Sequence, residues 1–475
     1  MKHSPAAYRD VFELRADQAC SGASDGIVFD VLPIPRYPRA DVICVVQEGS
    51  QLSTLPRRLE PAIALSDVFP TGLRYNPRCS FRPYGWVSDD PLYHARNTGG
   101  ALSVAGTMPT IAAAGAVRGA LRELFQLAGV NFSPNVAVFE NQHEYESLLQ
   151  SAVDQKQKLV FHQCHAPEEW PDNLYWIPRS LQARLNNKAN LGELVPAIHI
   201  PQRHLVPVRD LPRFAASNCT YPWVVKGASD AVGGGGSAVA FVHNQSDWSA
   251  VSEQLGNVEL AVVEQFIDAQ DNFCLNFFTQ GNDSAYLGGS RQLTDTGQYR
   301  GNLFDPNSGP PQRAVDIGHE IMRRAIALGY VGVAGFDMLC DRQNRIWVVD
   351  LNFRLNGSTP SLMWQPVLLS RSSGLKARLI NFYALDARSP QQSPRACIAD
   401  FVKEGTLFPL ALVTENRSHG PDPRLAFRGL AIGPTWNEVA RIVATIQRRV
   451  GSPPVVPHFA SARPPRRTPG LGAQS

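Results

Sequence analysis

The chain has 475 residues, enough for two or three domains that each bury a sizeable core. Its 45 basic and 42 acidic side chains give a formal net charge of +3, which is too small to favour nucleic acid or an anionic membrane as a partner. The eight cysteines show no C-x-x-C pairing, the N-terminus leads into polar sequence, and no apolar run is long enough to cross a bilayer. These features predict a cytoplasmic protein with reduced thiols.

The first 175 residues alternate strand and helix patterns. Apolar, β-rich runs at 42–47, 136–139 and 159–163 predict strands, and the run 115–128 predicts a helix. Such alternation is typical of a layered α/β domain. We therefore expect an N-terminal α/β domain over residues 1–175.

Two polar segments of this region contain residue types that can bind ligands. Residues 74–86 mix arginines with aromatic residues, which suits either a loop facing a substrate or a solvated, proline-rich connection, and the connection is favoured. The cluster His162-Gln163-Cys164-His165 suggests a metal site, but it lies in an expected strand and loop without a second ligand pair nearby. A structural role is therefore favoured for this cluster.

The segment 221–242 places a lysine and a glycine-rich loop between two apolar runs. Glycines let backbone N–H groups approach phosphate oxygens, and such a loop can close over a ligand. The Gly-Lys-Ser/Thr of a P-loop is absent, and a strand rather than a helix follows the glycines, which argues against a dinucleotide fingerprint. A flexible hairpin loop is the alternative. Lys226, one of only seven lysines, favours phosphate binding.

Two shorter segments lie on either side of this one in the chain. Residues 185–194 predict an asparagine-capped helix. Residues 260–267 predict a strand that ends in a polar turn, and backbone groups at such an end can bind an adenine edge. Taken alone, an ordinary strand end is the more frequent case.

Residues 333–354 predict a β-hairpin with acidic residues on both strands, because a turn cluster at 341–344 separates two apolar runs. A two-residue turn at Gln343-Asn344 would place Asp337 opposite Asp350. Opposed like charges are destabilising unless a cation neutralises them. Mg²⁺ typically takes one or two carboxylates together with nucleotide phosphates, so the hairpin predicts a magnesium site.

The second strand of the hairpin is expected to have two different faces, because side chains alternate along a strand. The expected sets are an apolar one, Trp347, Val349, Leu351 and Phe353, and a polar one, Asp350, Asn352 and Arg354. The polar set suits a divalent cation with phosphate oxygens, since hard cations take oxygen ligands and arginine binds anions. An edge strand with one solvated face is the alternative.

Taken in chain order, these segments resemble the ATP-grasp superfamily over residues 180–365. The motifs that carry the resemblance are Asn187-Lys188, Lys226 with its glycine loop, Glu264-Gln265-Phe266-Ile267, and Asp337…Asp350-x-Asn352-x-Arg354. The resemblance implies an α/β protein with an α+β ATP-grasp core of two lobes at 176–366, preceded by the N-terminal domain. A C-terminal unit is expected at 367–450, with helices over 368–385 and 436–450, and a disordered tail at 451–475.

The resemblance also implies roles for the matched residues. Those implied in ATP binding are Lys188, Lys226, Gly233, Gly234, Gly235, Gly236, Ser237, Glu264, Phe266, Ile267 and Asn272 (or Asp271 in its place). Those implied in binding Mg²⁺, or Mn²⁺, are Asp337, Asp350 and Asn352. Those implied in catalysis are Lys226, Arg354, which would stabilise the reacting acyl group, and Arg291, for which a surface position is equally consistent.

ATP-grasp members of this type join a carboxylate to an amine. The resemblance therefore implies an amide- or peptide-forming enzyme that works through an acyl phosphate and releases ADP and phosphate. Its partners would be small-molecule carboxylates and amines, such as amino acids or peptides, and a homodimer is compatible with it. Phe427-Arg428-Gly429-Leu430 with Trp436 also resembles pheganomycin-type peptide ligases.

Asp350 departs from the superfamily pattern, in which glutamate is usual. Aspartate still ligates Mg²⁺ but is one methylene shorter, so metal spacing or affinity can differ. Two alternatives therefore stay open. One is a different ATP-grasp chemistry, such as a carboxylase or a small-molecule kinase, and the other is a nucleotide-binding regulatory protein without catalysis.

Overall fold

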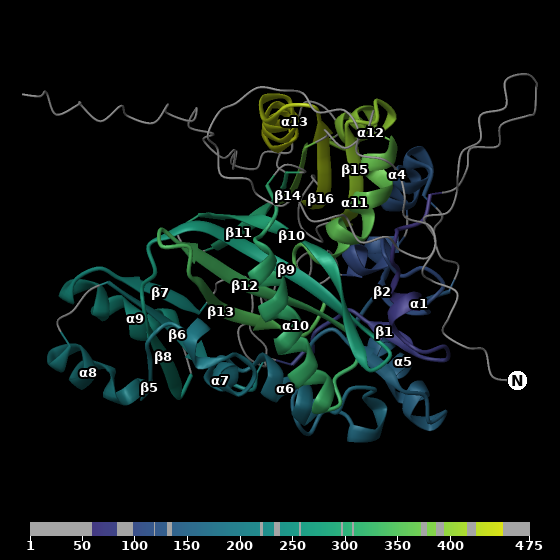
Figure 1. Ribbon diagram of the computed structural model, residues 1–475. Coiled ribbons are helices and arrows are strands. Elements are labelled where there is room, and N and C mark those ends of the chain that lie inside the picture. Colours follow the sequence, from purple (N-terminus) through teal and green to yellow (C-terminus); the bar gives the residue numbers. More distant parts are fainter. Residues whose placement is uncertain are drawn as a thin grey trace, which may run out of the picture. The chain divides into compact units, whose positions relative to one another are not determined.

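The computed structural model describes residues 59–82, 98–117, 119–130, 135–218, 222–231, 238–255, 258–295, 298–305, 308–371, 378–385, 394–415 and 424–449 (Figure 1). All the described residues belong to one compact unit, which contains three β-sheets.

The N-terminal sheet is parallel, with the strand order β3-β2-β1-β4. Its strands are β1 (Arg74–Asn76), β2 (Thr110–Ala113), β3 (Val136–Phe139) and β4 (Leu159–Phe161). The helices of this region include α1 (Leu65–Val68), α3 (Ala114–Val117), α4 (Ala120–Ala128) and α5 (Gln142–Asp154). The strand predicted at 136–139 is confirmed, the one at 159–163 ends at Phe161, and the helix predicted at 115–128 is divided by Gly119. The strand predicted at 42–47 lies outside the described residues.

The solvated connection expected at 74–86 is wrong for the part that the structure describes, 74–82. Arg74–Asn76 forms β1, which pairs with both β2 and β4. Arg78, Cys79 and Ser80 follow it and are all buried. Tyr75 and Arg78 therefore belong to the interior of the N-terminal region, whereas Arg82 is exposed.

A four-stranded antiparallel sheet with the order β5-β8-β6-β7 forms the first lobe of the central region. Its elements are β5 (Arg203–Pro207), β6 (Trp223–Ala228), β7 (Val239–Val242), β8 (Leu260–Gln265), α8 (Leu211–Ser217) and α9 (Trp248–Leu255). Trp223, Val225 and Val263 belong to the core of this lobe, which α9 covers. The strands predicted before and after the glycine loop are thus β6 and β7.

The largest sheet has eight strands in the order β13-β12-β9-β10-β11-β14-β16-β15, and all its neighbours are antiparallel. The strands are β9 (Ala269–Gln280), β10 (Asp283–Asp295), β11 (Gln298–Phe304), β12 (Val333–Asp341), β13 (Ile346–Asn352), β14 (Arg378–Leu385), β15 (Leu407–Glu415) and β16 (Arg424–Gly433). α10 (Gln312–Ala327) packs across β9 and β10 (Figure 1). The strands of the expected C-terminal unit therefore continue the sheet that carries the Asp337–Asp350 hairpin.

Three helices complete the C-terminal part: α11 (Thr359–Arg371), α12 (Pro394–Lys403) and α13 (Trp436–Arg449). The helix expected at 436–450 is confirmed as α13. The helix expected over 368–385 is wrong over 378–385, because this segment is strand β14 between β11 and β16. Leu379, Ile380 and Phe382 are all buried, and a short apolar run buried on both faces has no periodicity that separates strand from helix.

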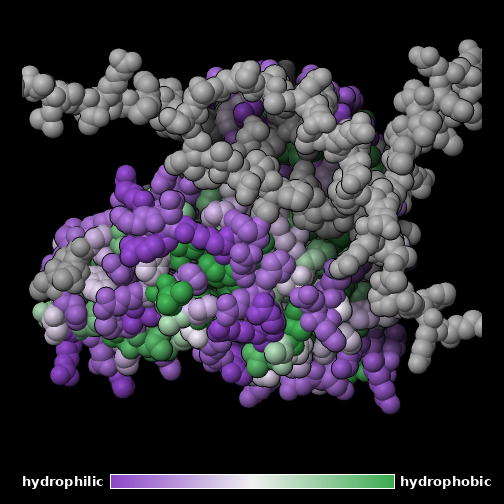
Figure 2. Space-filling view, viewed as in Figure 1, coloured by the Kyte–Doolittle hydropathy of each residue, from purple (hydrophilic) through white to green (hydrophobic). Residues whose placement is uncertain are grey.

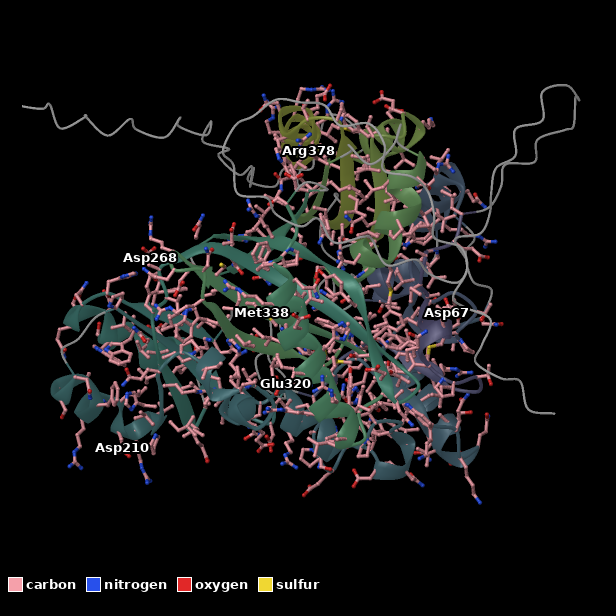
Figure 3. All side chains as sticks on the ribbon, in the orientation of Figure 1. Asp67, Asp210, Asp268, Glu320, Met338 and Arg378 are labelled. Atoms are coloured by element: carbon pink, nitrogen blue, oxygen red, sulfur yellow. The ribbon has the colours of Figure 1, made fainter. Side chains whose placement is uncertain are left out.

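Apolar side chains are mostly buried in the described part of the chain. Met338 lies among packed side chains, whereas Asp210 and Asp268 lie at the periphery (Figure 3). The large hydrophobic residues that are exposed in the described ranges are Leu127, Ile198, Leu205, Phe241 and Leu328, and the face in Figure 2 shows hydrophobic colour only in small areas. Among the described residues, no helix is both long and apolar enough to span a membrane.

The contact between α10 and β9 can be tested at Gly318. A Cβ on Gly318 would lie 2.1 Å from the Phe277 ring, so Gly318→Ala should lower the free energy of unfolding by about 1–3 kcal/mol through overpacking. The matched control is Gly192→Ala on α7 (Leu191–Leu194), where the nearest atom would be 3.8 Å away. Urea denaturation should show a loss of stability for the first variant only. Equal stabilities would contradict this packing.

Candidate functional site

The β12–β13 hairpin places Asp337 opposite Asp350, as predicted. The turn differs from the expected two-residue turn, because the last cross-strand pair is Cys340 with Ile346 and the Asp341 N–H donates to the Arg345 carbonyl. Between Met338–Val348 and Asp337–Asp350 the register shifts by one residue, which leaves Val349 as the extra residue of a β-bulge. The bulge shifts the register by one residue and so offsets the longer turn. Asp337 and Asp350 are therefore paired as expected, although the expected turn does not form.

The bulge also changes the faces of β13. Ile346 and Val348 are buried in the same hydrophobic core as Leu351 and Phe353. Trp347 and Val349 are only half-buried and do not belong to that core. The prediction that Trp347 and Val349 share a face with Leu351 and Phe353 is therefore wrong, because one inserted residue reverses the alternation of side chains.

The two opposed carboxylates have different polar partners. Lys188 Nζ donates to Asp350 Oδ1 at 2.6 Å, and Gln292 Nε2 donates to Asp337 Oδ1 at 2.8 Å. Burial and the charge of Asp350 raise the pKa of Asp337 to about 6. Burial would also raise the pKa of Asp350, but Lys188, Lys226 and Arg354 hold it below its ordinary value. The Asp350 carboxylate is thus stabilised in its ionised form by the neighbouring cations, whereas Asp337 holds a proton more readily.

Lys226 lies at the middle of β6 and is buried. Its Nζ donates to Glu264 Oε2 at 2.5 Å and to the carbonyl oxygen of the bulge residue Val349 at 2.8 Å. Arg203 Nε lies 3.8 Å from Glu264 Oε1, and its Nη2 donates to the Lys188 carbonyl at 2.5 Å. The four-stranded lobe therefore contacts the hairpin through Lys226.

Arg354 follows β13 and is oriented by Asn186, the last residue of α6 (Arg179–Asn186). Asn186 Oδ1 accepts from Arg354 Nη1 at 2.7 Å and from the Phe353 N–H at 3.0 Å. After α6, Asn187 caps the 3₁₀ turn Lys188–Asn190 by accepting from the Ala189 N–H at 3.0 Å. The asparagine-capped helix start predicted near Lys188 is this short turn.

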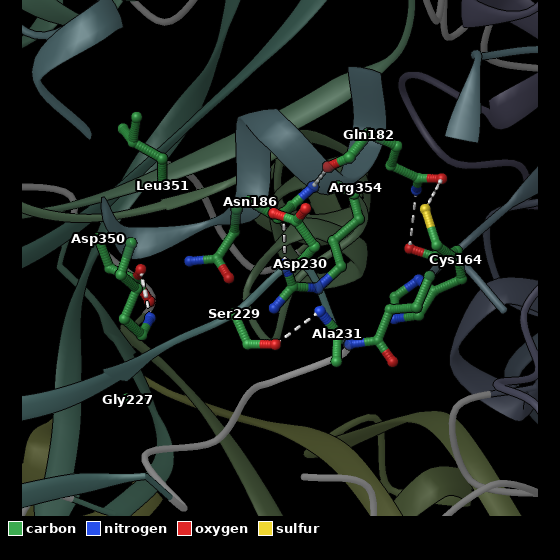
Figure 4. A pocket seen from close by; sticks show the side chains of 15 residues that line it. Cys164, Gln182, Asn186, Gly227, Ser229, Asp230, Ala231, Asp350, Leu351 and Arg354 are labelled. Carbon is green, nitrogen blue, oxygen red and sulfur yellow. Dashed lines mark hydrogen bonds and ion pairs between the residues drawn. The ribbon is translucent and has the colours of Figure 1, made fainter. Parts of the chain in front are cut away.

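Lys188, Asp350 and Arg354 line a pocket that is open to solvent, whereas Asp337 and Lys226 do not belong to its lining. In the view of Figure 4, Cys164 and Gln182 lie on one side of Arg354 and Asp350 lies on the other. The residues that line the pocket are His162, Gln163, Cys164, Gln182, Ala183, Asn186, Lys188, Gly227, Ser229, Asp230, Ala231, Asp350, Leu351, Asn352 and Arg354. The pocket thus joins the N-terminal region, the β6 lobe and the hairpin.

Some of the expected site residues are not brought to this pocket. Arg291 forms an ion pair with Asp271 at 2.8 Å, and its β10 neighbour Gln292, on the opposite face, contacts Asp337. Glu264 is buried behind Lys226, and Phe266 and Ile267 follow β8 in a half-buried turn. Gly233 to Gly236 and Ser237 lie outside the described residues.

Asn272 lies on β9 two residues before Cys274, so both side chains lie on the sheet face that carries Asp337. Its Oδ1 is buried and has no hydrogen-bond partner within the described ranges. A buried acceptor without a partner is costly, so a donor from a ligand would be stabilised there.

Sequence reasoning missed Asn186, Arg203 and Gln292, which hold Arg354, Glu264 and Asp337 in place. Asn186 is adjacent to the recognised Asn187-Lys188, and Gln292 is adjacent to Arg291, so proximity to a motif was the only signal. The sequence favours a structural role for the cluster 162–165. Three of its residues line the pocket, and among the described residues no group of three His, Cys, Asp or Glu side chains could hold a metal ion.

The loop between β13 and α11 is held by a buried polar network on the eight-stranded sheet. Asn276 of β9 donates to Ser358 Oγ at 2.8 Å and accepts from Thr359 Oγ1 at 2.6 Å. The Gly357 carbonyl accepts from Asn381 Nδ2 of β14 at 2.8 Å and from the Arg428 guanidinium of β16. The C-terminal strands thus fix the chain that directly follows Arg354.

Asp337, Asp350 and Asn352 offer carboxylate and amide oxygens, which are suitable ligands for Mg²⁺ or Mn²⁺. Asp350 already binds a cation, the Lys188 ammonium. Burial and, after it, the charge of Asp350 raise the pKa of Asp337, and a divalent cation would favour the ionised form of both carboxylates. The donor set therefore fits a hard cation.

Comparison with known protein families gives two matches. Residues 201–352 match the ATP-grasp domain of L-aspartate–L-methionine ligase, and residues 64–183 match the N-terminal domain of the same ligase. Together the matches cover more than half of the chain. The chain belongs to the ATP-grasp ligases. It is an ATP-dependent enzyme of the class that joins carboxylates to amines, so the prediction of a ligase is confirmed, whereas the pheganomycin-type resemblance stays a prediction.

Solved structures support the fold of this ATP-grasp ligase. An N5-carboxyaminoimidazole ribonucleotide synthetase in complex with ADP has a TM-score of 0.50 at 9% identity, and the match covers 82% of this chain and 98% of that one. The corresponding synthetase from Staphylococcus aureus, also with ADP, has a TM-score of 0.51 at 11% identity over 82% and 99% of the two chains. At this identity the likeness concerns the fold alone.

The opposed acids of the ligase predict a pH dependence of its metal-free stability. The folded pKa of Asp337, about 6, lies above the unfolded value of about 3.9. The folded state therefore binds more protons between these values, and the free energy of unfolding in EDTA should fall as pH rises from 5 to 7. The pKa of Asp350 is lowered, so this group changes the free energy of unfolding only at pH values below the range 5 to 7.

The corresponding measurement is urea denaturation in EDTA at pH 5, 6 and 7 for the wild type and Asp337→Asn. The variant has no carboxyl group at residue 337 to titrate, so its pH dependence should be flatter. The same slope in both proteins would assign the effect to other groups.

Proposed function

We propose that this ligase joins two amino acids, and that L-aspartate and L-methionine, named in the description of the matched family, are its substrates. The observation that carries the proposal is the pocket lined by Lys188, Asp350 and Arg354, with Asp337 opposite Asp350 on the neighbouring strand. Such a set of charges suits phosphoryl transfer, in which catalysis is mostly positioning and charge stabilisation.

The proposed reaction has two steps. A carboxylate oxygen of the donor attacks the γ-phosphorus of ATP, the bond to the ADP oxygen breaks, and an acyl phosphate forms. The amine nitrogen of the acceptor then attacks the acyl carbon, the C–N bond forms, and phosphate leaves while the amine loses a proton. No covalent intermediate with the enzyme is required.

Each proposed role follows from charge and position. Lys188 and Lys226 bind phosphate oxygens, which requires each lysine to exchange its present carboxylate partner for ATP. Arg354, oriented by Asn186, stabilises the acyl phosphate and the oxyanion that follows it. Asp337, Asp350 and Asn352 would hold Mg²⁺, which supplies positive charge at the phosphates when bound. Asn272, with its unpaired oxygen, is proposed to bind a ribose hydroxyl.

The substrates and products can be tested with the purified protein, ATP, Mg²⁺ and pairs of amino acids. Aspartate with methionine should release ADP and phosphate and yield one dipeptide, whose fragmentation by mass spectrometry reveals which residue was the acyl donor. Formation of AMP and pyrophosphate would exclude the acyl-phosphate route. Phosphate release without a dipeptide would point to another acceptor chemistry.

The role of Lys226 can be separated from its ion pair. Lys226→Met should lower turnover about 100-fold or more if the ammonium stabilises phosphate charge. It should also destabilise the fold, because Glu264 would be left buried with only the 3.8 Å contact to Arg203. Lys226→Met/Glu264→Gln should recover stability but not turnover, as measured by thermal melts and phosphate release. Lys158→Met, at an exposed lysine, is the control, and recovery of turnover in the double variant would refute the assignment.

A further inference from the structure

Arg78 is a buried arginine without a counter-ion in the described part of the chain. Its side chain lies in the interior with 7% of the residue exposed, and its Nε is buried without a hydrogen-bond partner. Within the described residues the guanidinium forms no ion pair and donates no hydrogen bond. Taking an ionised group out of water without pairing it is unfavourable, so buried charges are normally paired.

The acidic and hydroxyl groups nearby are already used by other side chains. Glu169 accepts from Ser80 Oγ at 2.8 and 2.6 Å, and one of its oxygens lies 3.3 Å from His165 Nδ1. The Tyr145 hydroxyl accepts from Asn76 Nδ2 at 2.8 Å and lies 3.2 Å from His165 Nε2. These contacts pair the polar side chains at the end of the N-terminal sheet with one another. Among the described residues they leave the Arg78 guanidinium without a hydrogen-bond acceptor.

Aromatic rings hold the guanidinium in place. Arg78 Cζ lies 3.4 Å from the centroid of the Phe81 ring, 5.8 Å from that of Phe139 and 5.9 Å from that of Tyr145. A ring stacked on a guanidinium occupies its flat face, whereas its N–H groups point outward in its plane. The side chain is therefore fixed in position with its donors available for a planar anion.

The position of Arg78 connects it to the pocket of the ligase. It follows the carboxyl end of β1, next to β4, and ligands of α/β sheets bind beyond the carboxyl ends of parallel strands. The adjacent Cys79 Sγ donates to Gln163 Oε1 at 2.6 Å, and Gln163 lines the pocket. Burial raises the pKa of the Cys79 thiol to about 12, and the charges of both Arg78 and Arg354 act against this rise. Both arginines are thus within electrostatic reach of one side chain.

We propose that Arg78 binds a substrate carboxylate that is not phosphorylated, and so positions one amino acid at the N-terminal wall of the pocket. A guanidinium pairs with a carboxylate through two parallel hydrogen bonds. Burial lowers the pKa of Arg78 to about 10, so the side chain is still cationic at neutral pH. The inference rests on the proposed joining of two amino acids. The carboxylate comes either from the acceptor or from the second carboxyl group of the donor.

The test compares free acids with their amides. For the wild type and Arg78→Gln, KM is measured for methionine against methioninamide, and for aspartate against each of its two monoamides. In the wild type one amide should have a KM about tenfold or more above that of its acid, since a charged hydrogen-bonding partner is lost. In Arg78→Gln this ratio should approach one, while KM for ATP stays unchanged. The substrate that shows the effect identifies the carboxylate.

Matched variants separate binding from packing. Arg342→Gln changes an exposed arginine paired with Asp268 and should keep the wild-type ratio. Arg78→Lys keeps the charge but loses the paired hydrogen bonds, and its ratio should fall between the other two. An unchanged ratio in folded Arg78→Gln overturns the proposal. If that variant does not fold, a wild-type ratio in Arg78→Lys overturns it instead.

A failure of the proposed function is distinguishable from a failure of this inference. If the wild type makes no dipeptide, calorimetric titration with the same acids and amides still measures binding. A preference for one acid that Arg78→Gln lacks supports the carboxylate site even then. Equal binding of acid and amide to the wild type refutes it.

Discussion

The opposition of Asp337 and Asp350 across two neighbouring strands is the constraint around which the site is organised. Two carboxylates at one cross-strand position repel each other unless cations or protons reduce their charge. Lys188 pairs with one of them, Gln292 donates to the other, and the pKa of Asp337 is raised. The antiparallel pairing thus brings two negative charges close together, and the surrounding cations compensate them. The same arrangement of charges suits a phosphate bound to a metal ion.

The bulge at Val349 connects this pair to the other lobe. It aligns the acids despite a longer turn, and the carbonyl oxygen of Val349 accepts a hydrogen bond from Lys226. Beyond the strand, Asn381 and Arg428 hold the loop at Gly357. Segments that are distant in sequence thus restrict the short stretch from Val349 to Gly357, which allows Arg354 a narrow range of positions.

The N-terminal region contributes a wall of the pocket as well as a fold that resembles other ATP-grasp enzymes. His162, Gln163 and Cys164 line the pocket directly, and Asn186 at the end of α6 orients Arg354. The carboxyl ends of β1 and β4 thereby face the chemistry expected at Arg354. A ligase must hold two substrates besides ATP, and the carboxylate site proposed at Arg78 would position one of them on this side of the pocket.

The sequence alone determined which short motifs form strands and which polar residues they carry. It predicted the hairpin and the Asp337–Asp350 pair, because alternation and turn residues are local properties. Only the tertiary structure decided that Trp347 and Val349 leave the apolar face, that 378–385 is a strand, and that Arg78 is buried. The local sequence pattern carries no periodic signal for a one-residue bulge, for pairing on both edges of a strand, or for burial by distant segments. Asn186, Arg203 and Gln292 could not be predicted for the same reason, since their partners are brought to them by the fold.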